Sequence, residues 1–227
     1  SLSSGTLTVN RRPLTATLAR QYDGTTTAAG SSLSSFNALQ GGQTLALTGS
    51  GTIASKNVGS GKSVTLGSIA LADGTGSAAN YSLSSTAMNV SQRPVILSGS
   101  RQYDASNTAK ASDLNNISGT VGTEKLELSG VGSFTDKNVG LNKALNLGSL
   151  RLKNGKSGGL AANYNLTSGT LTVEKRKLVL KGVRKDKIGT TQVLSRELSM
   201  SNLVEGEKLL LKGNGRIANT SHSINHK

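Results

Sequence analysis

The sequence of 227 residues contains no cysteine and no tryptophan, and it has only two prolines, four tyrosines and two phenylalanines. Without cysteine the chain forms no disulfide, no thiolate metal site and no cysteine nucleophile. No apolar run is long enough to span a bilayer, and the first residues show no signal-peptide pattern. Because aromatic residues are so few, we expect any core to be small and aliphatic.

Acidic residues are also scarce: 12 Asp and Glu stand against 26 Lys and Arg, for a net charge of +14. The excess grows along the chain, from 5 basic and 2 acidic residues in 1–90 to 9 and 5 in 91–173 and 12 and 5 in 174–227. A basic surface attracts polyanions. We therefore consider anionic polysaccharide or host-cell glycans as partners, expect no nucleic acid, and keep a merely solvated basic surface as the alternative.

What the sequence does contain is an internal repeat, in which Tyr22 and Tyr103 lie 81 positions apart. RQYDGTTTA at 20–28 recurs as RQYDASNTA at 101–109, KNVGSGK at 56–62 as KNVGLNK at 137–143, and AANYSL at 78–83 as AANYNL at 161–166. We divide the chain into the end of a preceding repeat (1–9), two whole units (10–90 and 91–173) and a diverged, truncated unit (174–227).

The repeated positions are the candidate sites, and we interpret them as structural. They are Tyr22, Asp23, Lys56, Asn57, Gly59, Asn80 and Tyr81 in the first unit, and Tyr103, Asp104, Lys137, Asn138, Gly140, Asn163 and Tyr164 in the second. The aspartate begins a turn, so its carboxylate is expected to accept backbone N–H groups. Phe134 aligns with Ile53 and Ile217, which predicts a core position.

Two patterns resemble reactive or ligand-binding motifs, and the repeat argues against both. Gly61, Lys62 and Ser63 end like a phosphate-binding loop, but the first glycine of that motif is missing and the second unit does not repeat it. His222 and His226 are the only histidines, and the Asn and Ser residues around them disfavour the helix that a metal site would need.

Catalysis also finds no support in the repeated carboxylates. Asp23, Asp104 and Asp186 occupy the single carboxylate position that we find recurring, which leaves acid–base chemistry without a pair. We therefore predict no enzyme and no cofactor.

Short runs of alternating apolar residues, separated by Gly and Asn-Gly turns, predict β-strands with one buried face. About seven strands per unit favour an immunoglobulin-like β-sandwich, and the short joints between tandem units predict a rod. The helix candidate is SSLSSFNALQ at 31–40, ended by Gly41 and Gly42. If this helix packs across a sheet, a β-grasp-like repeat is the alternative.

The last unit lacks segments equivalent to 63–71 and 81–90. We therefore expect the apolar runs at 178–183 and 208–213 to be partly uncovered. Docking on the second unit is the expected outcome, with strand exchange between copies or local disorder as the alternatives.

RQYDGTTTA, KNVGSGK and AANYSL, followed by LTV-type unit ends, resemble the YDG-type repeats of filamentous-haemagglutinin-like two-partner-secretion exoproteins. These are large bacterial adhesins. The resemblance implies passage through an outer-membrane transporter, a secreted or cell-surface location, and a stalk or spacer that projects a distal binding domain. The partners it implies are neighbouring repeats of the same chain. A basic binding module for anionic polysaccharide or host glycan remains the alternative function.

Overall fold

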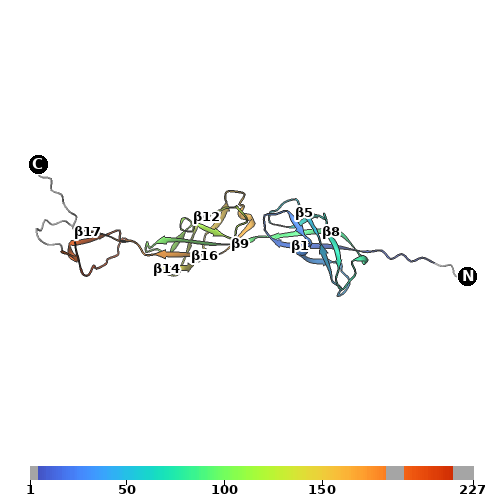
Figure 1. Cartoon of the computed structure of the whole chain (residues 1–227), viewed down its shortest axis with the longest axis horizontal. Coiled ribbons are helices and arrows are strands. Elements are labelled where there is room, and N and C mark those ends of the chain that lie inside the picture. Colours follow the sequence, from blue (N-terminus) through green and yellow to red (C-terminus); the bar gives the residue numbers. More distant parts are fainter. Residues whose placement is uncertain (1–4, 183–191, 217–227) are drawn as a thin grey trace.

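The computed structural model describes residues 5–182 and 192–216. Within them the regular elements are strands and three-residue 3-10 turns, so the all-β prediction is confirmed. The units follow one another in a row, in chain order (Figure 1). No helix in this part of the chain is long and apolar enough to cross a membrane.

The first unit is built on one large sheet and one two-stranded ribbon. Its elements are β1 (Arg12–Gln21), β2 (Thr27–Ala29), η1 (Gly30–Ser32), β3 (Leu33–Asn37), β4 (Leu45–Thr48), β5 (Ser50–Ile53), β6 (Gly59–Thr65), β7 (Ala70–Asp73), η2 (Ala78–Asn80) and β8 (Tyr81–Ser91). The large sheet has the order β2-β5-β6-β8-β1-β3, and β4 pairs with β7.

The first and last strands of this unit pair in parallel at the centre of the sheet, from Arg12 opposite Tyr81 to Gln21 opposite Ser91. The other strand pairs of the unit are antiparallel. The parallel pair differs from the purely antiparallel sheets of an immunoglobulin-like sandwich. Because β1 and β8 run the same way, the chain leaves the unit at the end opposite to its entry.

The second unit follows the same strand order, but its strands form one four-stranded sheet and two separate two-stranded pairs. Its elements are β9 (Arg93–Gln102), β10 (Thr108–Lys110), η3 (Ala111–Asp113), β11 (Asn116–Ser118), β12 (Leu126–Ser129), β13 (Val131–Ser133), β14 (Gly140–Ala144), β15 (Arg151–Asn154), η4 (Ala161–Asn163) and β16 (Tyr164–Glu174). Here β9 and β16 form the parallel pair, and β12 pairs with β15. Gln92 alone separates β8 from β9, so one extended segment passes between the units.

In the described residues of the third unit, the strands form two small pairs. It contains β17 (Val179–Gly182), β18 (Gln192–Leu194), η5 (Ser195–Glu197), β19 (Leu198–Ser201) and β20 (Asn214–Arg216). β17 pairs with β19, and β18 with β20. Leu180 is 50% exposed and Leu210 is 90% exposed, which confirms for the described residues that the apolar runs of this unit are partly uncovered.

The helix predicted for residues 31–40 is wrong. The chain makes the single 3-10 turn η1 and then enters β3, which pairs with β1. Four serines give this segment little helical preference, and pairing beside β1 satisfies its backbone groups instead. The β-grasp-like alternative therefore loses the helix on which it depended.

The core follows the predicted alternation. Leu14, Ala16 and Leu18 on β1 are buried while the residues between them are more exposed. Ile53 and Phe134 are both buried, which confirms that their shared position belongs to the core; Ile217 lies outside the described residues.

Candidate functional site

A fixed turn follows the first strand of each complete unit. Asp23 accepts a hydrogen bond from the Thr25 backbone N–H at 2.9 Å and pairs with Arg20. Burial alone would raise the pKa of Asp23, but the hydrogen bonds from Thr25 and the charge of Arg20 outweigh it and lower the pKa. Asp104 accepts the Ser106 N–H in the same way, so the interpretation of this aspartate as a turn residue is confirmed. Asp186 lies outside the described residues.

This turn presents Tyr22 to the second unit, where it meets a buried carboxylate. The Tyr22 hydroxyl donates to Glu124 Oε1 at 2.7 Å, and the Tyr164 hydroxyl donates to Glu124 Oε2 at 2.6 Å. Glu124 is only 8% exposed. Both of its oxygens are thus satisfied from two different units, as a buried carboxylate requires.

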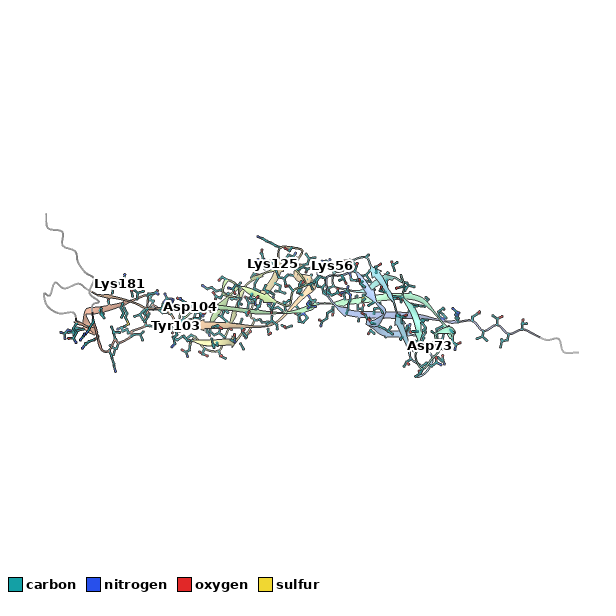
Figure 2. The ribbon with its side chains drawn as sticks, viewed as in Figure 1. Lys56, Asp73, Tyr103, Asp104, Lys125 and Lys181 are labelled. Atoms are coloured by element: carbon teal, nitrogen blue, oxygen red, sulfur yellow. The ribbon has the colours of Figure 1, made fainter. Side chains whose placement is uncertain are left out.

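Lys56 supplies the positive charge at this carboxylate. Its Nζ lies 3.0 Å from Glu124 Oε1 and 5.8 Å from the centre of the Tyr22 ring. Figure 2 labels Lys56 where the first unit meets the second. The hydrogen bonds to Glu124 and Tyr22 raise the pKa of Lys56, so it stays protonated.

The pKa values of the other groups follow from burial and from these contacts. Burial alone would raise the pKa of Glu124, but the hydrogen bonds from Tyr164, Tyr22 and Lys56 reverse the shift and lower it. Burial and the hydrogen bond to Glu124 raise the pKa of Tyr164 to about 12, and the same causes raise that of Tyr22. The cluster therefore holds one carboxylate, one ammonium group and two neutral phenols over a wide range of pH.

An asparagine from the second unit makes a second set of bonds across the junction. The Val58 backbone N–H donates to Asn163 Oδ1 at 3.0 Å, and Asn163 Nδ2 donates to Asn57 Oδ1 at 3.0 Å. Asn163 is 1% exposed, whereas the equivalent Asn80 of the first unit is exposed. The KNVG segment of one unit thus recognises the AANY segment of the next.

Apolar packing continues across the same boundary. Val95 and Tyr164 of the second unit belong to one buried cluster with Leu18 and Met88 of the first. The rings of Tyr22 and Tyr164 lie 5.5 Å apart at 79°, an edge-to-face contact. The two units therefore share a core at the junction.

Comparison with known families accounts for both complete units. The YDG domain matches residues 6–88 and again residues 89–172. The chain belongs to the YDG domain family. No curated protein and no solved structure matches it.

The YDG unit uses its repeated glycine-lysine stretch for its own loops. Lys143 Nζ donates to the Asp136 backbone oxygen at 2.7 Å and to the Asn138 backbone oxygen at 2.8 Å, and Lys62 reaches the Ser55 backbone oxygen at 3.4 Å. The sequence that resembles a phosphate-binding loop is thus a strand whose lysine folds back on the preceding loop. Gly59 and Gly140 begin the equivalent strands β6 and β14.

The junction between the second YDG unit and the third is built from fewer contacts. The Tyr103 hydroxyl donates to Glu207, and Arg176 donates to the Tyr103 backbone oxygen at 3.4 Å. Tyr103 and Asp104 are labelled at this end of the second unit in Figure 2. Lys137 and Asn138, the counterparts of Lys56 and Asn57, are exposed.

Sequence reasoning missed the carboxylate at the centre of the site. The prediction that the aspartate is the single recurring carboxylate is wrong. Glu124 and Glu207 occupy equivalent positions, and each accepts a hydrogen bond from a tyrosine hydroxyl of the preceding unit. The signal was present, since Gln43, Glu124 and Glu207 each stand two positions before the leucine run of their unit. Within the first unit the Tyr81 hydroxyl contacts Gln43, as the Tyr164 hydroxyl contacts Glu124 within the second.

The described residues contain no group of three His, Asp or Glu side chains placed to hold a metal ion. His222 and His226, the residues considered for a metal, lie outside the part of the chain that the structure describes. The site assembled here is a set of contacts between repeats.

Proposed function

We propose that this chain is a structural spacer segment of a large secreted bacterial adhesin, in which YDG units hold a distal binding domain away from the cell. The observation that carries the proposal is the first junction, where Tyr22, Lys56 and Asn57 of one unit meet Glu124, Asn163 and Tyr164 of the next. Positions that recur from unit to unit are used here to fix one unit on another. The proposal assigns no catalytic step to the chain.

The path of the chain supports the same role. A pulling force along the row acts on the first and last strands of each unit. In the first unit these strands, β1 and β8, are parallel neighbours, and ten residues of β1 are paired. Such a pull loads the backbone hydrogen bonds of the pair together, along the strand direction. This geometry suits a segment that transmits tension.

The finer assignments belong to the same proposal. Passage through an outer-membrane transporter, secretion and cell-surface location follow from the filamentous-haemagglutinin-like context. An immunoglobulin-like sandwich is supported by the ribbon of β4 and β7, whose Leu45 and Leu71 pack with Leu14 and Tyr81 of the main sheet.

A distance measurement across the junction tests the spacer role. The chain has no cysteine, so spin labels attach only to introduced ones. Ala46 and Glu127 are exposed, lie 81 positions apart and occupy the equivalent strands β4 and β12. We expect the Ala46→Cys/Glu127→Cys pair to give one narrow distance distribution. When Tyr22→Ala is added, the distance distribution of the same pair should broaden. A broad distribution without Tyr22→Ala would count against a stiff spacer.

A basic binding module is the second candidate, and one observation favours it. Lys125, Lys153 and Lys156 are exposed on the ribbon of β12 and β15 and the loop that joins its end. Retention on an immobilised anionic polysaccharide, weakened by salt and lost when all three lysines become glutamine, would favour binding. A spacer predicts no difference between this variant and the natural chain.

A further inference from the structure

A groove of about 790 Å³ opens on one side of the second unit, lined by β11, β12 and the segments beside them. Leu114, Ile117, Leu126 and Leu128 give it an apolar lining. Among its lining residues, all within the described part of the chain, Glu124 alone is hydrogen-bonded to the first unit. The groove has the volume of pockets that hold ligands, and the spacer role leaves it without a task.

The first unit fills the equivalent place with two of its own side chains. Phe36 and Leu39 pack there against a buried cluster that contains Leu45. The residues 81 positions later are Ile117 and Thr120, which are smaller, and both line the groove. The groove of the second unit therefore lies where the first unit places a phenylalanine ring and a leucine.

The leucines of the ribbon record this difference. In β4 of the first unit Leu45 is 8% exposed and Leu47 is 6% exposed. The equivalent residues of β12, Leu126 and Leu128, are only half-buried and line the groove. A ligand that covered them would remove apolar surface from water, which favours binding.

The groove also presents free strand edges. Among the described residues β11 pairs with β9 alone, and β12 pairs with β15 alone. The consecutive residues Leu126, Glu127 and Leu128 of β12 all line the groove. Because successive side chains of a strand point to opposite faces, such a run brings the backbone edge itself to the groove. An unpaired edge of this kind can accept an added strand.

The polar lining carries no excess of charge. Lys125, which is labelled in Figure 2, and Glu127 contribute one charge of each sign. The carboxylate of Glu124 is already paired with Lys56. The groove is therefore suited to an uncharged ligand rather than to the polyanion considered for the basic surface.

We propose that this groove binds an extended, uncharged peptide with phenylalanine or aliphatic side chains at alternate positions, as a strand added at the edge of β12. The first unit indicates which side chains fit, since Phe36 and Leu39 occupy the equivalent place. Backbone hydrogen bonds to β12 supply affinity, and the alternate side chains supply specificity. An oligosaccharide presents mostly hydroxyl groups, which match the apolar lining poorly. This inference does not depend on the spacer role.

Titration of the isotope-labelled full chain with end-blocked peptides, followed by NMR, tests the site. The set is Thr-X-Thr-Z-Thr, in which X and Z are each Phe, Leu, Ile or Val, and Thr-Ser-Thr-Ser-Thr is the control peptide. We expect at least one member of the set to shift the backbone amide signals of residues 114–117 and 126–128, and the serine peptide to shift none. The signals of the equivalent residues 33–36 and 45–47 should stay in place.

A pair of substitutions taken from the first unit tests the location. Ile117→Phe/Thr120→Leu places the residues of the first unit in the groove, and binding should weaken at least about tenfold. Ser118→Asn is the matched control, because it also introduces the residue of the first unit, Asn37, on the same strand. Ser118 is exposed and does not line the groove, so this variant should bind as the natural chain does.

A change in the peptide tests the strand pairing. Methylation of the backbone nitrogens of the best peptide keeps its side chains and removes its N–H donors. If the peptide pairs with β12, the methylated form should bind at least about tenfold more weakly.

Four results would overturn the proposal. No peptide of the set shifts the groove signals, or the Ile117→Phe/Thr120→Leu chain binds as tightly as the natural one. The methylated peptide binds as tightly as its parent, which would exclude pairing with the edge. Cellotetraose shifts the groove signals while no peptide does, which would make the groove a sugar site.

Discussion

The two junctions of this chain use the same tyrosine-to-glutamate hydrogen bond in different surroundings. At the first junction Tyr22 is 0% exposed and Glu124 is 8% exposed. At the second junction Tyr103 donates to Glu207 but is only half-buried. The hydrogen bond is therefore common to both junctions, and burial is what distinguishes them.

The difference lies in what the following unit contributes. At the first junction, Asn163 and Tyr164 at the start of β16 complete the site by reaching Val58 and Glu124. The described residues of the third unit offer no counterpart of β16. At the first junction the closing strand of the second unit therefore supplies the contacts that bury the end of the first unit.

Removal of the tyrosine ring should give the largest difference in stability between the two junctions. Tyr22→Ala takes a fully buried ring out of the shared core and one donor from Glu124, and it should cost about 3–5 kcal/mol of unfolding free energy. Tyr103→Ala, from a half-buried position, should cost about 1–2 kcal/mol. Urea denaturation, with amide hydrogen exchange to separate the units, measures both.

The phenylalanine variants separate the ring from its hydroxyl. Tyr22→Phe keeps the packing and removes one hydrogen bond to a charged group, so it should cost about 1.5–3 kcal/mol, less than the alanine variant. Equal costs for Tyr22→Ala and Tyr103→Ala would show that burial does not distinguish the junctions.

Acid should weaken the first junction through Glu124, with a smaller effect than loss of the ring. The folded state lowers the pKa of Glu124 below its ordinary value of 4.5. Its contribution to stability is thus fully present above pH 4.5 and is lost as the pH falls through the lower, folded value. Glu124→Gln should remove this part of the loss of unfolding free energy in acid. If the variant lost as much stability in acid as the natural chain, the loss could not be attributed to Glu124.

Alkali should weaken the same junction through Tyr164. The folded state raises its pKa from 10.0 to about 12. The stabilisation is therefore complete below pH 10 and disappears as the pH rises toward about 12. Tyr164→Phe should reduce this loss in a measurement of the free energy of unfolding against pH.

Much of the fold followed from local patterns in the sequence. Period-2 alternation found the strands, and the exchange of Phe134 with Ile53 identified a core position. The helix prediction for 31–40 was wrong because β3 pairs with β1, and helix propensity takes no account of such a long-range contact. The parallel pairing of β1 with β8 is likewise a long-range property.

The site was harder to predict because it is divided between two units. The repeat identified Tyr22, Lys56 and Asn163 as special, but it did not reveal that they meet across a boundary. Glu124 was overlooked because the first unit has Gln43 at the equivalent position, so the carboxylate did not appear in every copy.

The smallest predicted effect concerns the third position of the YDG motif, where the two complete units differ. Gly24 has a φ of +78°, and a Cβ built there would lie 2.8 Å from Cγ1 of Val121 in the next unit. The equivalent Ala105 already adopts a φ of 62°, which costs a non-glycine residue about 1 kcal/mol. Gly24→Ala should therefore destabilise the first junction by at least about 1 kcal/mol, since it adds a contact with Val121 to the backbone strain.

Ala105→Gly should act in the opposite direction, because it relieves the strain at the half-buried second junction. The gain should be less than about 1 kcal/mol, since glycine also loses more backbone freedom on folding. Thermal unfolding of both single variants measures the two effects. Opposite signs would mean that the motif glycine is needed for backbone conformation at both junctions. A Gly24→Ala chain as stable as the natural one would show that Val121 moves aside, and that the first junction is looser than its buried contacts indicate.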